Sequence, residues 1–221
     1  MRHFDVEMND LKSRLVEMAG LVQQMIKSTI DQLVSRDEKL SETIFGYEKE
    51  VNIQEIVIDD KCLKLIALNQ PVGADLRFIT SAMRINSDLE RMGDEAVNIS
   101  EMASDLIKYP ALKPLIDIPK MADIVRRMVE DSIKAFNTND VELAKAVLEQ
   151  DDEVDDLKDV VFRDLKVYMT ESSDPITIQR AVDLIMVARS IERIGDHATN
   201  ISEDVIFMVH GKDIRHPKTF K

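Results

Sequence analysis

The feature that most constrains the fold of this chain is an internal repeat. Residues 90–101 read ERMGDEAVNISE and residues 192–203 read ERIGDHATNISE, which are nine identities in twelve positions at an offset of 102. Weaker matches recur at an offset of 103, between Met25 and Met128, Asp37 and Asp140, Leu40 and Leu143, and Val51 and Val154. One duplicated unit of about 100 residues explains all of these matches.

Each unit is expected to be helical. The chain of 221 residues has only 6 Gly and 6 Pro, and no Pro precedes Pro71. This scarcity of turn residues excludes a many-turned sandwich or barrel. Apolar residues at a 3–4 spacing favour long helices with a buried stripe. The predicted stripes are Leu11, Leu15, Met18, Val22 and Met25; Leu40, Ile44, Tyr47, Val51, Ile58, Cys62 and Leu65; Ile85, Leu89, Met92, Ala96, Ile99 and Ala103; Val147, Val154, Leu157, Val161, Leu165 and Tyr168; and Val187, Ile191, Ile194, Ala198, Ile201 and Val205.

The predicted fold is therefore all-α, with two tandem three-helix bundles. Six long antiparallel helices are related in two sets of three by the internal duplication. A first repeat over residues 1–109 is followed by a linker over 110–119, where three prolines cluster, and by a second repeat over 120–221.

Local signals predict several helix ends. Ser35 and Glu38 have the spacing of a capping box before the second helix. Pro71 is expected at the first position of the third helix. In the second repeat we expect a fourth helix from about Lys120 to Asn137, an N-cap at Asn139, an N-cap at Asp174 followed by Pro175, and a stop at Gly211.

Charge and cysteine content limit the functional classes. The chain has 42 acidic and 29 basic residues, a net charge of −13, which repels phosphate backbones and argues against nucleic-acid binding. The single Cys62 excludes an intramolecular disulfide and fits a reducing compartment, and it lies on an apolar stripe, as a core residue would. Because the start of the chain lacks an apolar signal region and no segment resembles a membrane span, we expect a cytoplasmic protein.

The repeated segment places oxygen-bearing side chains in a line. Residues four apart share one helix face, which groups Glu90, Asp94 and Asn98 in the first copy and Glu192, Asp196 and Asn200 in the second. Two carboxylates at this spacing repel unless a positive charge lies between them. A hard divalent or trivalent cation takes such ligands, so a metal-binding face is one interpretation. A solvated acidic face is the other, because roughly eight such pairs are expected by chance in a chain this acidic.

Other residues of the repeat have structural interpretations. Gly93 and Gly195 are expected to let another backbone come close. Arg91 and Arg193 are expected to form ion pairs with a neighbouring helix, since they point about 100° away from the glutamates. His197 stands where the first copy has Glu95, so a metal site common to both copies cannot depend on it, and a solvent-facing or pairing histidine is favoured.

Further acidic residues are candidates for the same cation sites. Residues 149–159 contain seven acidic residues in eleven, without the glycine of a calcium-binding loop, so an acidic helix face is the default. Additional ligands could come from Glu55 with Asp59, Asp152 with Asp156, and Asp155 with Asp159. The chain has no phosphate-binding glycine loop, nucleophile elbow or metalloprotease motif, so we expect no catalytic site.

The segments LERMGDEAVNIS and IERIGDHATNIS, the QPVGADLR before the third helix and the duplicated three-helix plan resemble the PhoU family of bacterial phosphate-transport regulators. The resemblance covers essentially the whole chain and departs at Glu95, where the family often has an aromatic residue. It implies a cytoplasmic, usually dimeric accessory factor that acts between the phosphate ABC transporter, chiefly its ATPase subunit, and a membrane sensor histidine kinase. It also implies metal clusters on the E/D-x-x-x-D motifs, here Glu90 with Asp94 and Glu192 with Asp196.

Three hypotheses follow. The first is a non-enzymatic negative regulator of phosphate uptake and phosphate-starvation signalling, a homodimer that contacts the membrane through its partners only. It would bind a divalent or trivalent metal such as iron, zinc, manganese or magnesium, or none. The second is a metal-dependent hydrolase or metal-storage protein built on a carboxylate bundle, against which the lack of a histidine or nucleophile in both copies counts. The third is a purely structural helical scaffold.

Overall fold

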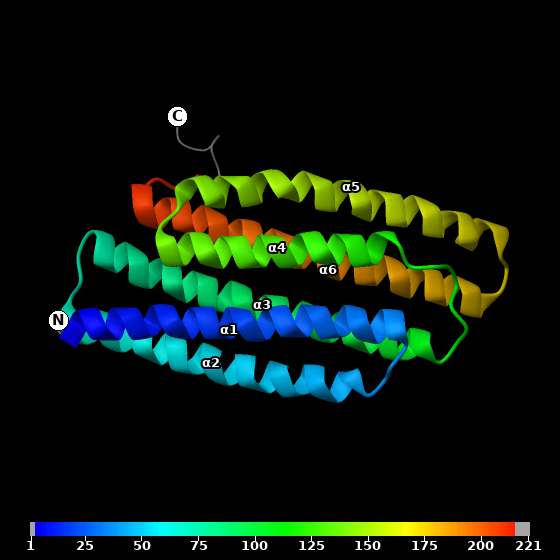
Figure 1. Cartoon of the computed structure of the whole chain (residues 1–221), viewed down its shortest axis with the longest axis horizontal. Helices are drawn as coiled ribbons and strands as arrows, with labels where there is room; N and C mark the ends of the chain where they lie inside the picture. The colour runs from blue at the N-terminus through cyan, green and yellow to red at the C-terminus, as the bar shows by residue number, and fades with distance from the viewer. Residues whose placement is uncertain (1–2, 215–221) are drawn as a thin grey trace.

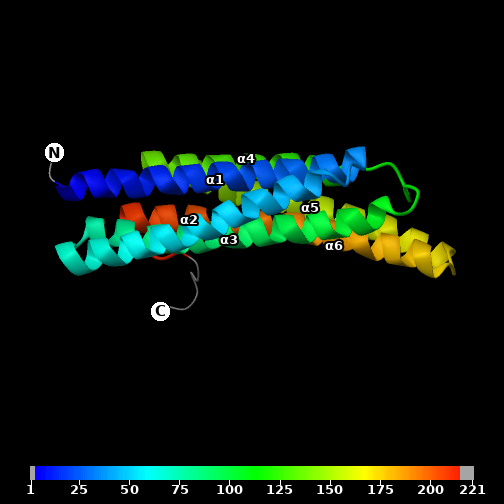
Figure 2. The ribbon, with the colours of Figure 1, turned by 90° about the horizontal axis from the view of Figure 1, so that it is seen from below.

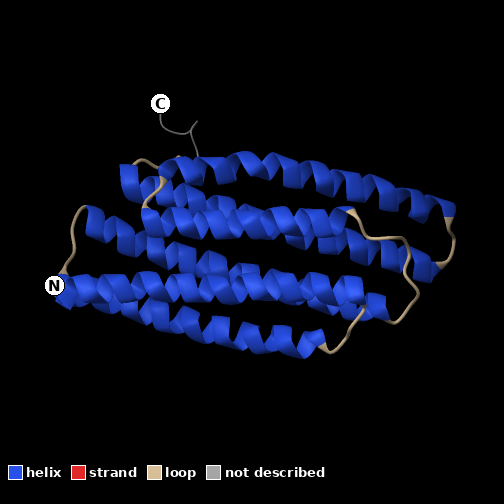
Figure 3. Cartoon of the chain, in the orientation of Figure 1, coloured by secondary structure: helices blue, strands red, loops and turns tan. Residues whose placement is uncertain are grey.

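The computed structural model describes residues 3–214, which form six long helices and short connections (Figure 3). No strand occurs within residues 3–214, so the predicted all-α class is confirmed. The start of the first predicted repeat, residues 1–2, and the end of the second, residues 215–221, lie outside the described residues. The helices are α1 (His3–Ser35), α2 (Leu40–Asn69), α3 (Ala74–Ile107), α4 (Asp117–Thr138), α5 (Val141–Glu171) and α6 (Pro175–His210).

The helices form two three-helix bundles that lie side by side along one long axis (Figure 1). Helices α1, α2 and α3 pack on one another, and so do α4, α5 and α6. The bundles meet mainly where α3 packs against α6, and additionally where α1 packs against α4 (Figure 2). Helices α2 and α5 are therefore outer helices that contact only their own bundle within the described chain.

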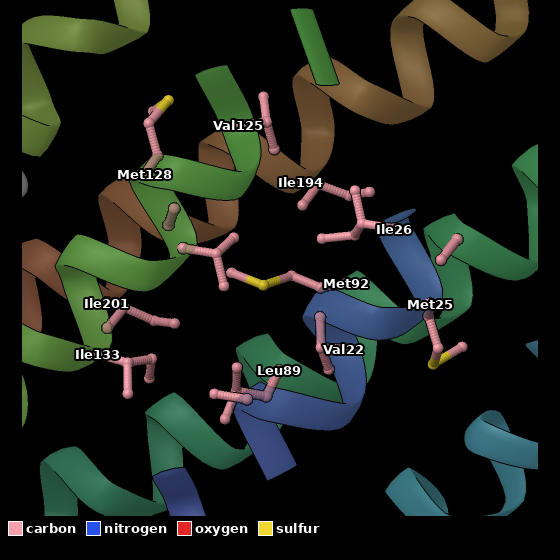
Figure 4. Close-up of a cluster of buried hydrophobic side chains, with 14 of the residues drawn as sticks. Val22, Met25, Ile26, Leu89, Met92, Val125, Met128, Ile133, Ile194 and Ile201 are labelled. Carbon is pink, nitrogen blue, oxygen red and sulfur yellow. The ribbon is translucent and has the colours of Figure 1, made fainter. Parts of the chain in front are cut away.

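One hydrophobic core runs through both bundles. Buried side chains from α1, α3, α4 and α6 converge where the bundles meet, with Met92 among them (Figure 4). The predicted apolar stripes are buried, with three exceptions: Leu40 and Tyr47 are partly buried and Tyr168 is exposed. The 3–4 periodicity thus predicted which face of each helix enters the core.

Two predicted helix ends are confirmed. The carboxylate of Asp174 caps α6 by accepting hydrogen bonds from the backbone amides of Ile176 and Thr177, at 3.4 and 3.0 Å, and Pro175 follows at the first helical position. At the other end of α6, Gly211 adopts φ 67°, and its amide donates to the Phe207 carbonyl at 2.7 Å. Glycine adopts this left-handed conformation without steric cost, which is why the helix ends there.

Two predicted caps are wrong. Asn139 does not cap α5; it ends α4 in a left-handed conformation that asparagine tolerates, and Asp140 caps α5 by accepting from the Leu143 amide at 3.0 Å. The capping box of Ser35 and Glu38 does not form either. Ser35 is still the last residue of α1, and the residue at the N-cap of α2 makes no side-chain capping bond.

Two prolines, Pro71 and Pro119, do not lie where the sequence predicted them relative to the helices. Pro71 does not start α3, because α2 ends with Gln70 in a left-handed conformation and Pro71 follows that C-cap, where a proline prevents the helix from continuing. Helix α3 begins only after Gly73, which has a φ of 59°. Pro119 was expected in the linker but lies in the first turn of α4, where no backbone donor is required of it.

Candidate functional site

Four carboxylates on α2 and α3 form what we call the first carboxylate face: Glu48, Glu55, Glu90 and Asp94. Burial and then the charge of Asp94 raise the pKa of Glu90, and burial and then Glu48 raise the pKa of Asp94. Burial, then the charge of Asp59 and that of Asp94, likewise raise the pKa of Glu55. Among the residues that the structure describes, no lysine or arginine forms an ion pair with any of the four. These carboxylates therefore repel one another with no ion-paired lysine or arginine between them.

Four carboxylates on α5 and α6 form the second carboxylate face: Asp151, Asp155, Glu192 and Asp196. Burial, followed by the charges of Asp196 and other neighbours, raises the pKa of Asp151 to about 6. Burial and then Glu192 raise the pKa of Asp196.

This second face contains a cation of its own. The ammonium of Lys158 lies 2.6 Å from Asp155 Oδ1 and 2.8 Å from Glu192 Oε1, and so links α5 to α6. Lys158 is a site residue that the repeated segments do not predict.

Glu48 and Asp151 were also missed as site residues. They occupy the same position of the two repeats at the offset of 103 that relates Val51 to Val154, and both are acidic. That correspondence at the offset of 103 is the sequence signal that marks both residues.

Several predicted ligands lie elsewhere. The amides of Asn98 and Asn200 turn toward the contact between α3 and α6, where they donate to Glu95 at 3.4 Å and to Asp88 at 3.3 Å. Asp59 accepts a hydrogen bond from Asn86 at 3.0 Å. The carboxylates of Asp152, Asp156 and Asp159 belong to exposed residues of α5.

The first carboxylate face has the chemistry that a hard cation needs. It offers only oxygen donors, which suit magnesium and manganese better than soft metals. Within residues 3–214, however, no three His, Cys, Asp or Glu side chains already converge on a point where one ion would be held. Binding would therefore require carboxylates such as Glu90 and Asp94 to adopt other rotamers.

A row of polar pairs joins the two bundles, which we call the α3–α6 seam. It consists of Arg84 with Asp204 at 2.8 Å, Asp88 with His197 at 2.8 Å, and Glu95 with Arg193 at 2.6 Å. The side chains of Asp88, Glu95, His197 and Asp204 are nearly buried. The seam therefore fixes the register between α3 and α6 through charged groups that need their partners.

The contacts of the α3–α6 seam test the predicted pairings of Arg91, Arg193 and His197. Arg193 forms the predicted ion pair with a neighbouring helix. Arg91 does not, because it is exposed and has no acidic partner within 4 Å among the described residues. His197 is a buried pairing histidine, as one of its two structural interpretations stated.

The expected role of the repeated glycines is wrong. A β-carbon added to Gly93 would meet side chains only, the nearest being Val51 at 3.5 Å, and one added to Gly195 would meet Val125 at 3.5 Å and Asp151 at 3.7 Å. These are ordinary contact distances, and no other backbone comes close. Neither glycine is required for the packing of its helix.

We therefore expect Gly93→Ala to stabilise the protein. Alanine inside a helix is favoured over glycine by about 0.5–1 kcal/mol, and the added methyl group has room here. Urea unfolding followed by circular dichroism at 222 nm measures the change. Gly73→Ala is the contrasting variant and should destabilise, because Gly73 has a φ of 59°. A lower stability of Gly93→Ala would show that the site is tighter than the structure indicates.

Fold and site together define a class of protein: a duplicated, all-helical chain that carries an acidic face at the same place in each repeat. No described helix has an apolar stretch long enough to cross a membrane. Burial, with Asp59 nearby, raises the pKa of the Cys62 thiol to about 12, so it is not a reactive nucleophile.

The family model described as the PhoU domain matches the chain twice, over residues 15–103 and 118–205. The chain belongs to the PhoU family. A Pseudomonas putida relative is 37% identical over 216 residues, covering 97% of this chain and 84% of the relative. An Aquifex aeolicus relative is 41% identical over 210 residues, covering 95% and 94%. Both are named phosphate-specific transport system accessory protein PhoU homolog.

Solved structures agree with this assignment. The crystal structure of PhoU from Pseudomonas aeruginosa superposes with a TM-score of 0.90 at 34% identity and covers 95% of this chain and 100% of its own. A phosphate transport system regulatory protein PhoU from Streptococcus pneumoniae has the same fold, with a TM-score of 0.87 at 23% identity, and covers 96% and 99%. The resemblance seen in the repeated segments is confirmed.

Proposed function

We propose that this protein is a non-catalytic negative regulator of phosphate uptake and phosphate-starvation signalling. It would couple the ATPase subunit of the phosphate ABC transporter to a sensor histidine kinase and repress starvation signalling when phosphate is plentiful. The observation that carries the proposal is the match of both repeats to the PhoU domain, together with relatives that are named as accessory proteins of phosphate transport. The same reasoning supports a cytoplasmic location, with membrane contact only through the partners.

An asymmetry between the outer helices supports binding to other proteins. Helix α2 exposes the apolar side chains of Ile53, Ile56, Leu63 and Leu68. At the offset of 103, helix α5 has Asp156, Asp159, Lys166 and Glu171 at these positions. At these four positions the first repeat thus has apolar side chains where its own copy is charged, while α5 exposes Phe162 and Val167 at other positions. We propose that the protein is a homodimer in which the α2 helices of two copies cover this surface, since apolar residues of two helices pack well at such spacings.

Metal binding at the first carboxylate face is a further part of the proposal. Burial raises the pKa values of Glu55, Glu90 and Asp94, and the charge of Glu48 acts on the last two. A hard cation would relieve both effects by supplying positive charge. When bound, the ion would hold α2 and α3 together and offer a positive centre to a partner. Glu90 and Asp94 would bind it from α3, and Glu48 and Glu55 from α2.

The functional test is genetic and biochemical. In a strain that lacks the chromosomal copy, a phosphate-starvation reporter should be expressed in high phosphate, and the native chain should restore repression. The tagged chain should capture the transporter ATPase subunit or the sensor kinase to an extent that depends on phosphate. A reporter that ignores the protein, together with no phosphate-dependent partner, would refute the regulatory role. Such a result would favour the carboxylate-bundle hydrolase or storage protein.

A further inference from the structure

We infer that the second carboxylate face binds no metal ion, because the ammonium of Lys158 already occupies the place of the cation. The inference deepens the proposed function and rests on its metal-binding part, since it separates the two repeats into one that takes an ion and one that does not.

The contacts of Lys158 place its charge between the helices. Its ammonium lies 2.6 Å from Asp155 on α5 and 2.8 Å from Glu192 on α6, and its side chain is 29% exposed. Glu192 is the equivalent of Glu90 in the twelve-residue repeat and one of the two carboxylates of its E-x-x-x-D motif. In the second repeat, a carboxylate of this motif is therefore already neutralised by a protein side chain.

The internal repeat shows which residues of the first carboxylate face correspond to those of the second. At the offset of 103, Asp151 corresponds to Glu48, and Lys158 corresponds to Glu55. The second face thus has a cation where the first has a potential ligand, and it has a carboxylate, Asp155, where the first has Asn52. The difference at Glu55 and Lys158 removes one potential ligand and adds one positive charge, and Asp155 adds a second partner for that charge.

A metal ion and this ammonium exclude each other. A protonated lysine has three donors and no lone pair, so it cannot act as a ligand. A divalent ion close enough to bind Glu192 would stand within a few ångströms of a like charge and would have to displace the ammonium from Glu192. In the first face, no described lysine or arginine is ion-paired with a carboxylate, and the neighbouring Arg91 acts on Glu90 only at longer range.

The test exchanges the two corresponding residues and measures bound Mn²⁺. Native protein, Lys158→Glu and Glu55→Lys are freed of metal with a chelator, dialysed against Mn²⁺, and assayed for manganese per chain by atomic emission. Glu55→Lys should bind less Mn²⁺ than the native protein, because it removes a ligand of the first face and places an ammonium there. Lys158→Glu should bind one Mn²⁺ more than the native protein, because it restores the acidic residue of the first face and removes the competing charge. Lys145→Glu is the matched control, since it makes the same change of charge in an exposed ion pair on the same helix and should bind no more than native.

Further variants separate this inference from the metal-binding proposal. Asp94→Ala removes a ligand of the first face, and a native level of Mn²⁺ in this variant would refute binding there. The gain from Lys158→Glu should persist when it is combined with Asp94→Ala, because the two faces are separate.

The inference is overturned if Lys158→Glu gains no Mn²⁺ while keeping the native helical signal, or if Asp196→Ala removes Mn²⁺ from the otherwise native chain. Should Lys158→Glu fail to fold, Lys158→Gln replaces it, and an unchanged Mn²⁺ content in this neutral variant overturns the inference equally.

Discussion

Met92→Ala is expected to destabilise the protein by about 3 kcal/mol, since truncating a fully buried methionine removes apolar contact and leaves a cavity. Met92 lies among side chains from both bundles, where Val22, Leu89 and Ile194 surround the centre of the core (Figure 4). The loss should therefore weaken the contact between the bundles as well as the first bundle itself. Urea unfolding followed by circular dichroism at 222 nm measures the effect as a lower midpoint.

Met186→Ala is the matched control for this prediction. Met186 is on α6 and is 40% exposed, so its truncation should change stability by no more than about 0.5 kcal/mol. Equal effects of the two variants would contradict a continuous core through Met92. Two separate unfolding transitions in Met92→Ala would show that the bundles had become independent.

Arg193→Ala is expected to cost about 2 kcal/mol, although most of the arginine side chain is exposed. The reason lies in its partner: the carboxylate of Glu95 is nearly buried in the α3–α6 seam, and it would lose the guanidinium that lies 2.6 Å away. Thermal and urea unfolding both measure this change, and added salt should weaken the native pair less than an exposed pair.

The internal repeat supplies the control for this variant. Arg91 is the equivalent of Arg193, is exposed and has no such partner among the described residues, so Arg91→Ala should change stability by no more than about 0.5 kcal/mol. Adding Glu95→Gln to Arg193→Ala should recover most of the loss, because the buried charge is then removed. If the cost of Arg193→Ala remains unchanged in that double variant, the arginine acts by packing alone.

The fold was predictable from this sequence to a large extent. The spacing of apolar residues predicted which faces are buried, and Asp174 with Pro175 and Gly211 predicted two helix ends, because each depends on local stereochemistry. Pro71 misled because a proline suits both the start of one helix and the segment after another, and only the left-handed Gln70 before it distinguishes them.

The site was less predictable because it depends on contacts between helices. The repeated segment identified Glu90, Asp94, Glu192 and Asp196 as candidates, but their neighbours on α2 and α5 come from a weakly conserved part of the duplication. Periodicity alone does not tell whether Asn98 faces the carboxylates or the other bundle. The pairing of Asp88 with His197 could not be predicted from the sequence either, because it depends on the packing of α3 against α6.

The α3–α6 seam also has a consequence for the history of the duplication. Asp88, Glu95 and Arg91 correspond to Ser190, His197 and Arg193, so the two sides of the seam began as identical surfaces and then diverged. If two first repeats met as α3 now meets α6, Asp88 would face Glu95 where it now faces His197, and two carboxylates would be buried together. An isolated first repeat is therefore not expected to substitute a second copy of itself for its missing half. Divergence at Glu95 and His197 thus makes the α3 surface complementary to α6 and not to a second copy of α3, which favours keeping the two repeats in one chain.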